Sequence, residues 1–82
     1  MTEASLLGDV IDVIRSAGKV AAEVPIDGEK RLVDDLGIDS LDLVGVFLQL
    51  QDQYDVVIDD DDLPNLRRVI DLADYIQRAR AA

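Results

Sequence analysis

Apolar residues recur at helical spacing near the start of the chain, from residue 3 to about residue 17. Asp9 and Asp12 fall on the opposite side of the same helical projection. Spacings of three and four residues predict a helix with one buried face. Gly18 then occupies the place of a glycine that ends a helix at its C′ position. The apolar stripe consists of Leu6, Val10, Val13, Ile14 and Ala17.

The next segment, residues 19–39, has no sustained hydrophobic period and contains several turn-forming residues, so it is predicted to be a loop. A loop of this length is unusual in a small domain unless it is functional or is held to the core by apolar side chains. The turn-forming residues are Pro25, Asp27, Gly28 and Gly37. The side chains that we expect to hold the loop are Leu32, Leu36 and Ile38.

A second helix is predicted from Asp39 or Ser40 to about Tyr54. Asp39 is expected to cap its free backbone amides, and the charge of Asp42 suits the positive end of the helix dipole. Two apolar stripes run along this helix on different faces. The first consists of Leu43, Val46, Phe47, Leu50 and Tyr54, and the second of Leu41, Val44 and Leu48. The second stripe is either additional core or a surface kept apolar for a partner.

The last third of the chain predicts one acidic turn from Asp59 to Leu63, limited by Pro64, and a final helix from Arg67 or Arg68 to Arg78. Asp74 is placed to form a weak surface pair with Arg78. The expected core residues of the final helix are Val69, Leu72, Ala73 and Ile76. The predicted fold is all-α: a small four-helix bundle of three long helices and one short one, with a long loop between the first two. Residues 1–82 are expected to form a single domain.

Composition narrows the possible functions. The 82 residues include no Cys and no His, which excludes disulfides, Cys/His zinc sites, thiol nucleophiles and imidazole bases. The net charge is −10, and residues 32–66 hold Asp residues but no Lys or Arg, so this stretch carries the excess negative charge. Such a surface repels nucleic acid and anionic membranes and favours basic protein partners. The opening residues lack a positively charged signal segment, so we expect a cytoplasmic protein. We also expect it to be a monomer.

The run from Asp59 to Asp62 is acidic enough to suggest calcium, but the EF-hand loop needs alternating oxygen ligands, a glycine at position six and a glutamate at position twelve. Pro64 and Leu66 interrupt any such pattern here. We therefore expect a solvated acidic turn and no metal site.

Ser40 is the hydroxyl residue with the most informative position. It stands at the first turn of the second predicted helix, where backbone amides and the helix dipole favour an anionic group such as an attached phosphate. Catalysis by Ser40 would need a general base, but there is no His, and the nearest lysine in the preceding loop is Lys30. The chain is therefore not expected to be an enzyme. An alternative is that Ser40 simply caps the helix.

The segment from Leu36 to Asp42, with the sequence Leu-Gly-Ile-Asp-Ser-Leu-Asp, resembles the prosthetic-group attachment motif of acyl carrier proteins. The resemblance extends over roughly residues 3 to 78. It implies that Ser40 accepts 4′-phosphopantetheine from coenzyme A through a phosphopantetheinyl transferase, forming a phosphodiester. The thiol of the arm would then carry acyl intermediates as thioesters to enzymes of fatty-acid, polyketide or specialised secondary-metabolite biosynthesis.

The same resemblance implies that the second helix is the recognition helix. Its partners would be the transferase and acyl-activating or acyl-transferring enzymes and synthases that have basic docking patches. The implied partner-binding residues are Asp39, Leu41, Asp42, Val44 and Leu48. Cargo would retreat between this helix and the later ones, and the implied lining of that acyl pocket is Val46, Phe47, Leu50, Leu63, Ala73 and Ile76.

The chain also departs from the family pattern. Gly45 and Gln51 stand where fatty-acid carriers usually have Glu, and Arg67 and Arg68 stand where the family usually has Ser or Thr. These departures favour a specialised pathway over bulk fatty-acid synthesis. Two alternatives stay open: a stand-alone aminoacyl or peptidyl carrier, and a non-carrier acidic interaction domain in which Ser40 is only a cap.

Overall fold

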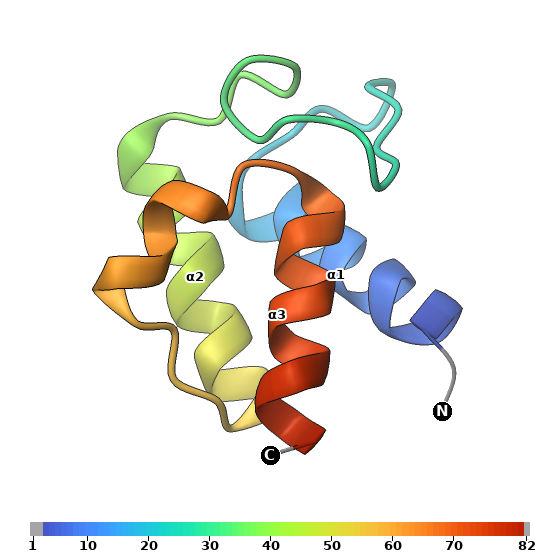
Figure 1. The fold of residues 1–82 in the computed structure, drawn as a ribbon. Helices are drawn as coiled ribbons and strands as arrows, with labels where there is room; N and C mark the ends of the chain where they lie inside the picture. Colours follow the sequence, from blue (N-terminus) through green and yellow to red (C-terminus); the bar gives the residue numbers. More distant parts are fainter. Residues whose placement is uncertain (1–2, 82) are drawn as a thin grey trace.

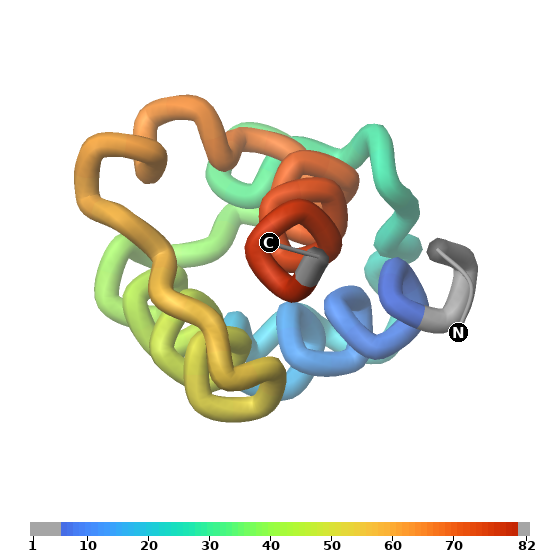
Figure 2. The backbone as a smooth tube through the Cα atoms, turned by 60° about the horizontal axis from the view of Figure 1, so that its bottom comes forward, coloured from blue at the N-terminus to red at the C-terminus, as the bar shows by residue number. Residues whose placement is uncertain are grey.

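The computed structural model describes residues 3–81, and in this range it has three α-helices and one 3-10 helix. These are α1 (Glu3–Ala17), α2 (Ser40–Tyr54), η1 (Asp60–Asn65) and α3 (Val69–Ala81). Figure 1 shows the long loop that joins α1 to α2, with η1 lying between α2 and α3 in the chain. Figure 2 looks nearly along α3 and shows α1, α2, η1 and the loop arranged around it. The predicted all-α bundle is confirmed.

The core is formed by the apolar faces that the sequence predicted. The predicted core positions that are buried are Leu6, Val10, Val13 and Ile14 of α1, Val46 and Leu50 of α2, and Val69, Leu72, Ala73 and Ile76 of α3. Four further buried residues lie in connecting segments and were not predicted: Val20, Val56, Ile58 and Leu66. The connecting segments therefore close the ends of the bundle. Separately, no helix in residues 3–81 is both long and apolar enough to cross a bilayer.

The end of α1 differs by one residue from the prediction. Lys19, not Gly18, adopts the left-handed conformation, with φ 57°. The amide of Lys19 donates to the carbonyl of Ser16 (3.4 Å) and that of Val20 to Arg15 (3.1 Å), which is the Schellman arrangement. Gly18 is needed for space instead, because a Cβ there would lie 2.5 Å from the carbonyl oxygen of Ile14.

The long loop is held to the core, as predicted. Leu32 and Ile38 are buried, and Leu36 is half-buried. The loop is also joined by backbone hydrogen bonds to the segment before α3, which the sequence did not predict. The amide of Leu32 donates to the carbonyl of Arg67 (2.8 Å), that of Val69 to Lys30 (3.1 Å) and that of Ile70 to Gly28 (2.9 Å). An isolated antiparallel bridge pairs Arg31 with Arg68.

The acidic turn predicted after α2 is present as η1, but the prediction that Pro64 limits it is wrong, because η1 continues through Pro64 to Asn65. The last helix, α3, begins at Val69 and ends at Ala81, later at both ends than predicted. Asp71 sets this start, since its carboxylate accepts hydrogen bonds from the backbone amides of Arg67 (3.2 Å) and Arg68 (2.9 Å). The expected carboxylate pairing of Asp74 with Arg78 is wrong, because the Arg78 Nε donates to the carbonyl oxygen of Asp74 (3.3 Å).

Tyr75 connects α3 to η1. Its hydroxyl donates to the Oδ2 of Asp62 (2.9 Å) and accepts from the amide of Asp59 (3.2 Å). The hydrogen bond from the Asp59 amide favours the ionised phenol and by itself lowers the pKa of Tyr75. The hydrogen bond to Asp62, partial burial and the negative charges of Asp62 and Asp59 outweigh it, so the pKa of Tyr75 is raised. The acidic turn is thereby fixed against the last helix.

Candidate functional site

Ser40 is the first residue of α2, and its side chain is exposed. The residue at the N-cap position is Asp39, with extended backbone angles (φ −65°, ψ 151°). The carbonyl of Asp39 accepts the first helical hydrogen bond, from the amide of Leu43 (2.8 Å). Because Ser40 lies inside the helix, the alternative in which Ser40 is the N-cap is wrong.

The prediction that the Asp39 side chain caps α2 is also wrong. Asp39 is at the correct position, but its carboxylate makes no capping hydrogen bond. The N-terminus of this 15-residue helix therefore has amides that its own cap residue leaves free, beside an exposed hydroxyl. Free amides and the positive end of the helix dipole favour an anion at this position. The site fits a phosphate ester on Ser40 Oγ.

An apolar strip runs along the outer face of α2 from this serine. We call it the α2 strip, and it consists of Leu41, Val44 and Leu48, which are 80%, 53% and 60% exposed. The structure decides the alternative that the sequence left open, because this stripe is surface and not core. Gly45 lies within the strip, and a Cβ there would meet nothing within 4 Å. The strip is thus open to a partner along its whole length.

The two acidic residues near Ser40 differ in their surroundings. Asp39 is exposed, whereas Asp42 is half-buried. The Oδ1 of Asp42 lies 3.5 Å from the Nζ of Lys19, which follows α1. Sequence reasoning did not find this pairing, because it depends on the left-handed turn at Lys19. A basic partner therefore meets a free carboxylate at Asp39 and a partly neutralised one at Asp42.

A cleft of about 470 Å³ opens between the start of α2, the long loop and η1. Leu43 in its wall is three residues after Ser40, and residues at this spacing are neighbours on a helix surface. The apolar lining consists of Leu32, Val33, Leu43, Leu63, Pro64 and Leu66. Arg31, Asp34 and Arg67 supply the charged lining.

This cleft contains one of the six residues predicted to line an acyl pocket, Leu63. Val46, Leu50 and Ile76 are fully buried, Ala73 is nearly so, and Phe47 is half-buried against the core. The sequence analysis did not place Leu32, Leu43 and Leu66 in the pocket lining. These residues come from three separate segments. Their apolar character was visible, but only the tertiary fold brings them together.

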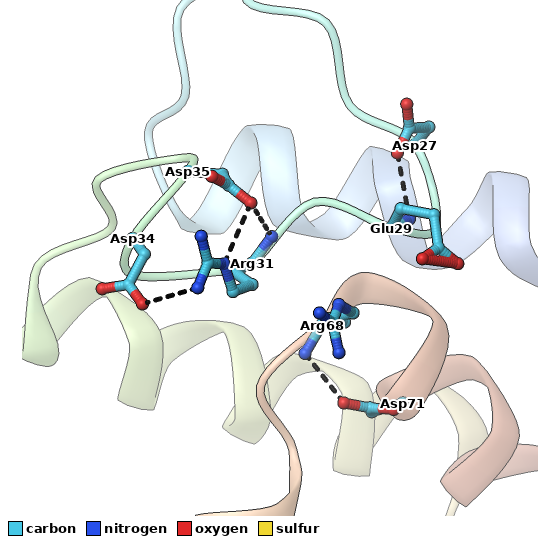
Figure 3. A network of polar contacts seen from close by, with 7 residues as sticks. All are labelled: Asp27, Glu29, Arg31, Asp34, Asp35, Arg68 and Asp71. Atoms are coloured by element: carbon cyan, nitrogen blue, oxygen red, sulfur yellow. Dashed lines mark hydrogen bonds and ion pairs between the residues drawn. The ribbon is translucent and has the colours of Figure 1, made fainter.

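Carboxylates hold the loop that leads to Ser40. The Oδ2 of Asp35 accepts from the backbone amide of Arg31 (2.8 Å) and from its Nε (3.4 Å), while Asp34 lies 3.5 Å from the Arg31 Nη1 (Figure 3). The backbone hydrogen bond from Arg31 is the main reason that the pKa of Asp35 is lowered from its ordinary value of 3.8. Gly37, with φ 66°, then turns the chain towards α2.

Comparisons with known proteins place this geometry in a family. Residues 8–76 match the family described as "Phosphopantetheine attachment site". The chain is 38% identical over 82 residues to "Acyl carrier protein" of Syntrophobacter fumaroxidans, covering all of both chains. It is 47% identical over 72 residues to "Acyl carrier protein" of Thermobifida fusca, covering 88% of this chain and 86% of that protein.

Two further comparisons extend the range of relatives. "Meromycolate extension acyl carrier protein" of Mycobacterium tuberculosis is 37% identical over 78 residues, covering 95% of this chain and 67% of that protein. The crystal structure of an acyl carrier protein from Thermotoga maritima has the same fold, with a TM-score of 0.76 at 22% identity, covering 94% of this chain and 88% of that one.

Proposed function

The chain belongs to the acyl carrier protein family, whose members carry covalent 4′-phosphopantetheine, and we propose that Ser40 is the residue that bears this group. The observation that supports the proposal is the exposed hydroxyl at the start of α2, beside amides that Asp39 does not cap. When bound, the group supplies a thiol to which an acyl chain is attached as a thioester. The protein is a carrier and not a catalyst.

The chain's own residues present and orient the attachment oxygen. The free amides at the start of α2 stabilise the negative charge of the phosphodiester on Ser40. The phosphopantetheinyl transferase would join Ser40 Oγ to the pantetheine phosphate as the phosphoanhydride bond of coenzyme A breaks, and adenosine 3′,5′-bisphosphate would leave. The serine proton passes to a base of that enzyme, since this chain has no His.

The attachment site is tested by incubating the protein with coenzyme A and a broad-specificity phosphopantetheinyl transferase, followed by intact mass measurement. We expect one adduct on the wild-type protein and none on Ser40→Ala. Ser16→Ala is the matched control, because Ser16 is also exposed but lies at the end of α1. An adduct that persists on Ser40→Ala, or its absence from the wild type, would contradict the proposal.

We propose that partner enzymes bind the α2 strip together with Asp39 and Asp42. A small apolar surface with carboxylates beside it suits weak and fast exchange between enzymes that have basic docking patches. Leu41→Ala should slow the transfer of the arm to the protein and leave stability unchanged, because Leu41 is 80% exposed. Val57→Ala is the matched control, since Val57 is 79% exposed but follows the other end of α2. Equal transfer rates for the two variants would count against this surface.

Cargo is proposed to shelter in the interior behind the cleft, along the predicted lining. Support comes from the continuity of apolar side chains between Leu63 in the cleft and the core around Leu50. Val46, Leu50 and Ile76 have no exposed area, so a chain longer than the cleft must displace packed side chains. A series of acyl lengths on the holo protein, followed by methyl chemical shifts of these residues, tests the proposal. Shifts confined to the arm would defeat it.

A specialised polyketide or other secondary-metabolite pathway is the proposed setting. Gly45 and Gln51 make α2 less acidic than in carriers for bulk fatty-acid synthesis, so the partner enzymes should differ. The second candidate is an aminoacyl or peptidyl carrier, because nothing in the attachment site distinguishes the carboxylic acids it can bear. The intact mass of the protein isolated from its native host, with the thioester preserved, identifies the cargo.

A further inference from the structure

The cleft beside Ser40 contains one cationic group with no acidic partner. Arg67 lines the cleft, and its Nε donates to the carbonyl oxygen of Pro64 (3.3 Å). Among the described residues, no carboxylate lies within ion-pair distance of its guanidinium. Arg31, in the same lining, differs because Asp34 and Asp35 pair with it. The terminal nitrogens of Arg67 thus retain unused donors beside an apolar wall.

Arg67 is also held in position. Its carbonyl accepts the amide of Leu32 (2.8 Å), and its own amide donates to the Oδ2 of Asp71 (3.2 Å). Together with the Nε contact to Pro64, these bonds fix the backbone and the inner end of the guanidinium. An anchored guanidinium loses less freedom on binding an acceptor than a mobile side chain does, so it is a better source of selectivity.

We propose that this cleft selects acyl cargo with an oxygen acceptor, most strongly a carboxylate, near the end of a short apolar chain, and that Arg67 is the specificity-determining residue. The inference rests on the proposed attachment at Ser40, which is one helical turn from Leu43 in the cleft wall. A plain hydrocarbon chain can cover the leucines, but it offers no acceptor to the exposed guanidinium, whose donors then stay bound to water. A carboxylate satisfies them with charge-assisted hydrogen bonds.

Because the chain as a whole is negatively charged, selection of a carboxylate cargo acts only at short range. With a net charge of −10, the protein repels an anionic cargo at long range. Binding in the cleft therefore depends on short-range contact with Arg67, supported by the apolar walls. Because Arg67 is exposed, a single charge-assisted hydrogen bond of this kind should change the population of docked cargo by up to about fivefold.

The test compares two cargoes of equal length on the holo protein, hexanoyl and its ω-carboxylate analogue adipoyl. NMR follows the Nε–Hε signal of Arg67 and the methyl signals of Leu63 and Leu66. We expect adipoyl to shift all three and hexanoyl to leave the Arg67 signal unchanged. The holo protein without cargo serves as the reference for both cargoes. If the Arg67 signal already differs between the apo protein and this reference, the guanidinium binds the phosphate of the arm, and the inference is overturned.

Two variants make the test specific to the side chain. Arg67→Gln should reduce the docked population of adipoyl by up to about fivefold, judged from the methyl shifts. Arg68→Gln is the matched control, because Arg68 is the adjacent exposed arginine and does not line the cleft. Equal effects of the two variants, or equal spectra for the two cargoes on the wild type, would overturn the inference. Intact mass separates the two proposals. A protein that is not loaded at Ser40 contradicts the proposed attachment site, whereas a loaded protein whose Arg67 signal does not respond contradicts only the inference about the cleft.

Discussion

Replacement of Gly18 by alanine should destabilise the protein, although alanine normally stabilises a chain relative to glycine. A Cβ at this position would lie 2.5 Å from the carbonyl oxygen of Ile14 and 3.2 Å from the Cδ1 of Ile38. The first contact is with backbone, so it cannot be relieved by rotating a side chain. Gly18 is buried where α1 ends against the loop and α2, and relief must therefore move these segments apart.

The size of the effect follows from two opposing terms. Overpacking a well-packed site costs about 1–3 kcal/mol. Reduced freedom of the unfolded chain returns about 0.4–1 kcal/mol when glycine becomes alanine. The two ranges combine to a net loss of about 0–2.6 kcal/mol. Because the closest contact is with backbone, Gly18→Ala should lie in the upper part of this range, at roughly 1–2 kcal/mol, which corresponds to a fall in Tm of about 4–16 °C for a domain of this size. Gly8→Ala is the matched control within α1, since a Cβ there meets nothing within 4 Å. It should gain up to about 1 kcal/mol from helix propensity.

Urea unfolding followed by far-UV circular dichroism, at fixed salt and pH, measures both variants. The decisive quantity is the difference in unfolding free energy between Gly18→Ala and Gly8→Ala, which should exceed about 1.5 kcal/mol with opposite signs against the wild type. The reasoning is refuted if Gly18→Ala is as stable as the wild type or more stable. The Gly18 variant should also load the arm more slowly, because Ile38 precedes the attachment serine by two residues.

Three further outcomes are expected. Tyr75→Phe should lower the unfolding free energy by about 1 kcal/mol, because the hydroxyl that bonds Asp62 is lost; an unchanged urea midpoint would contradict this. Asp35→Asn should be less stable than the wild type near neutral pH. The folded pKa of Asp35 is lowered from 3.8, so the stabilisation by its carboxylate is present above that value and is lost as the pH falls through the folded pKa. Urea unfolding at stepped pH should therefore show the unfolding free energies of the two proteins converging as the pH falls. A constant difference between them would argue against the assignment. Added salt or divalent cations should raise the Tm by screening the excess of carboxylates, and a flat Tm from low to moderate ionic strength would show that their repulsion is unimportant.

The helices and their buried faces could be predicted from sequence because they depend on local spacing. Leu6 and Val10, or Val69 and Leu72, lie on one face of a helix in any fold that contains that helix. The exposure of Leu41 could not be predicted, since it depends on how much of α2 the other helices cover. The register at the end of α1 was also missed, because the usual preference for glycine at C′ was outweighed by the close contact of Gly18 with its neighbours.

The candidate site also has one part that the local sequence predicts and one part that only the tertiary fold creates. The position of Ser40 at a helix start was visible in the motif itself, whereas the cleft was not. Its walls join a loop leucine, Leu32, to Leu43 of α2 and to Leu66 after η1, and no periodicity relates these segments. The free donors of Arg67 depend on which carboxylates the fold directs elsewhere. Asp71 caps the start of α3 and Asp34 pairs with Arg31, and both contacts join residues three apart in the chain. The spacing allows these contacts, but it does not show that Arg67 is the arginine left without a carboxylate.

The backbone hydrogen bonds between residues 28–32 and residues 67–70 also constrain the order of events during synthesis. While the chain is still on the ribosome, residues 28–32 lack these backbone partners until residues 67–70 have emerged. The serine is therefore presented in its final form only after residues 67–70 have been made. Modification by the transferase should accordingly require this segment, and chains truncated before Val69 should be poor substrates even though they contain the complete attachment motif.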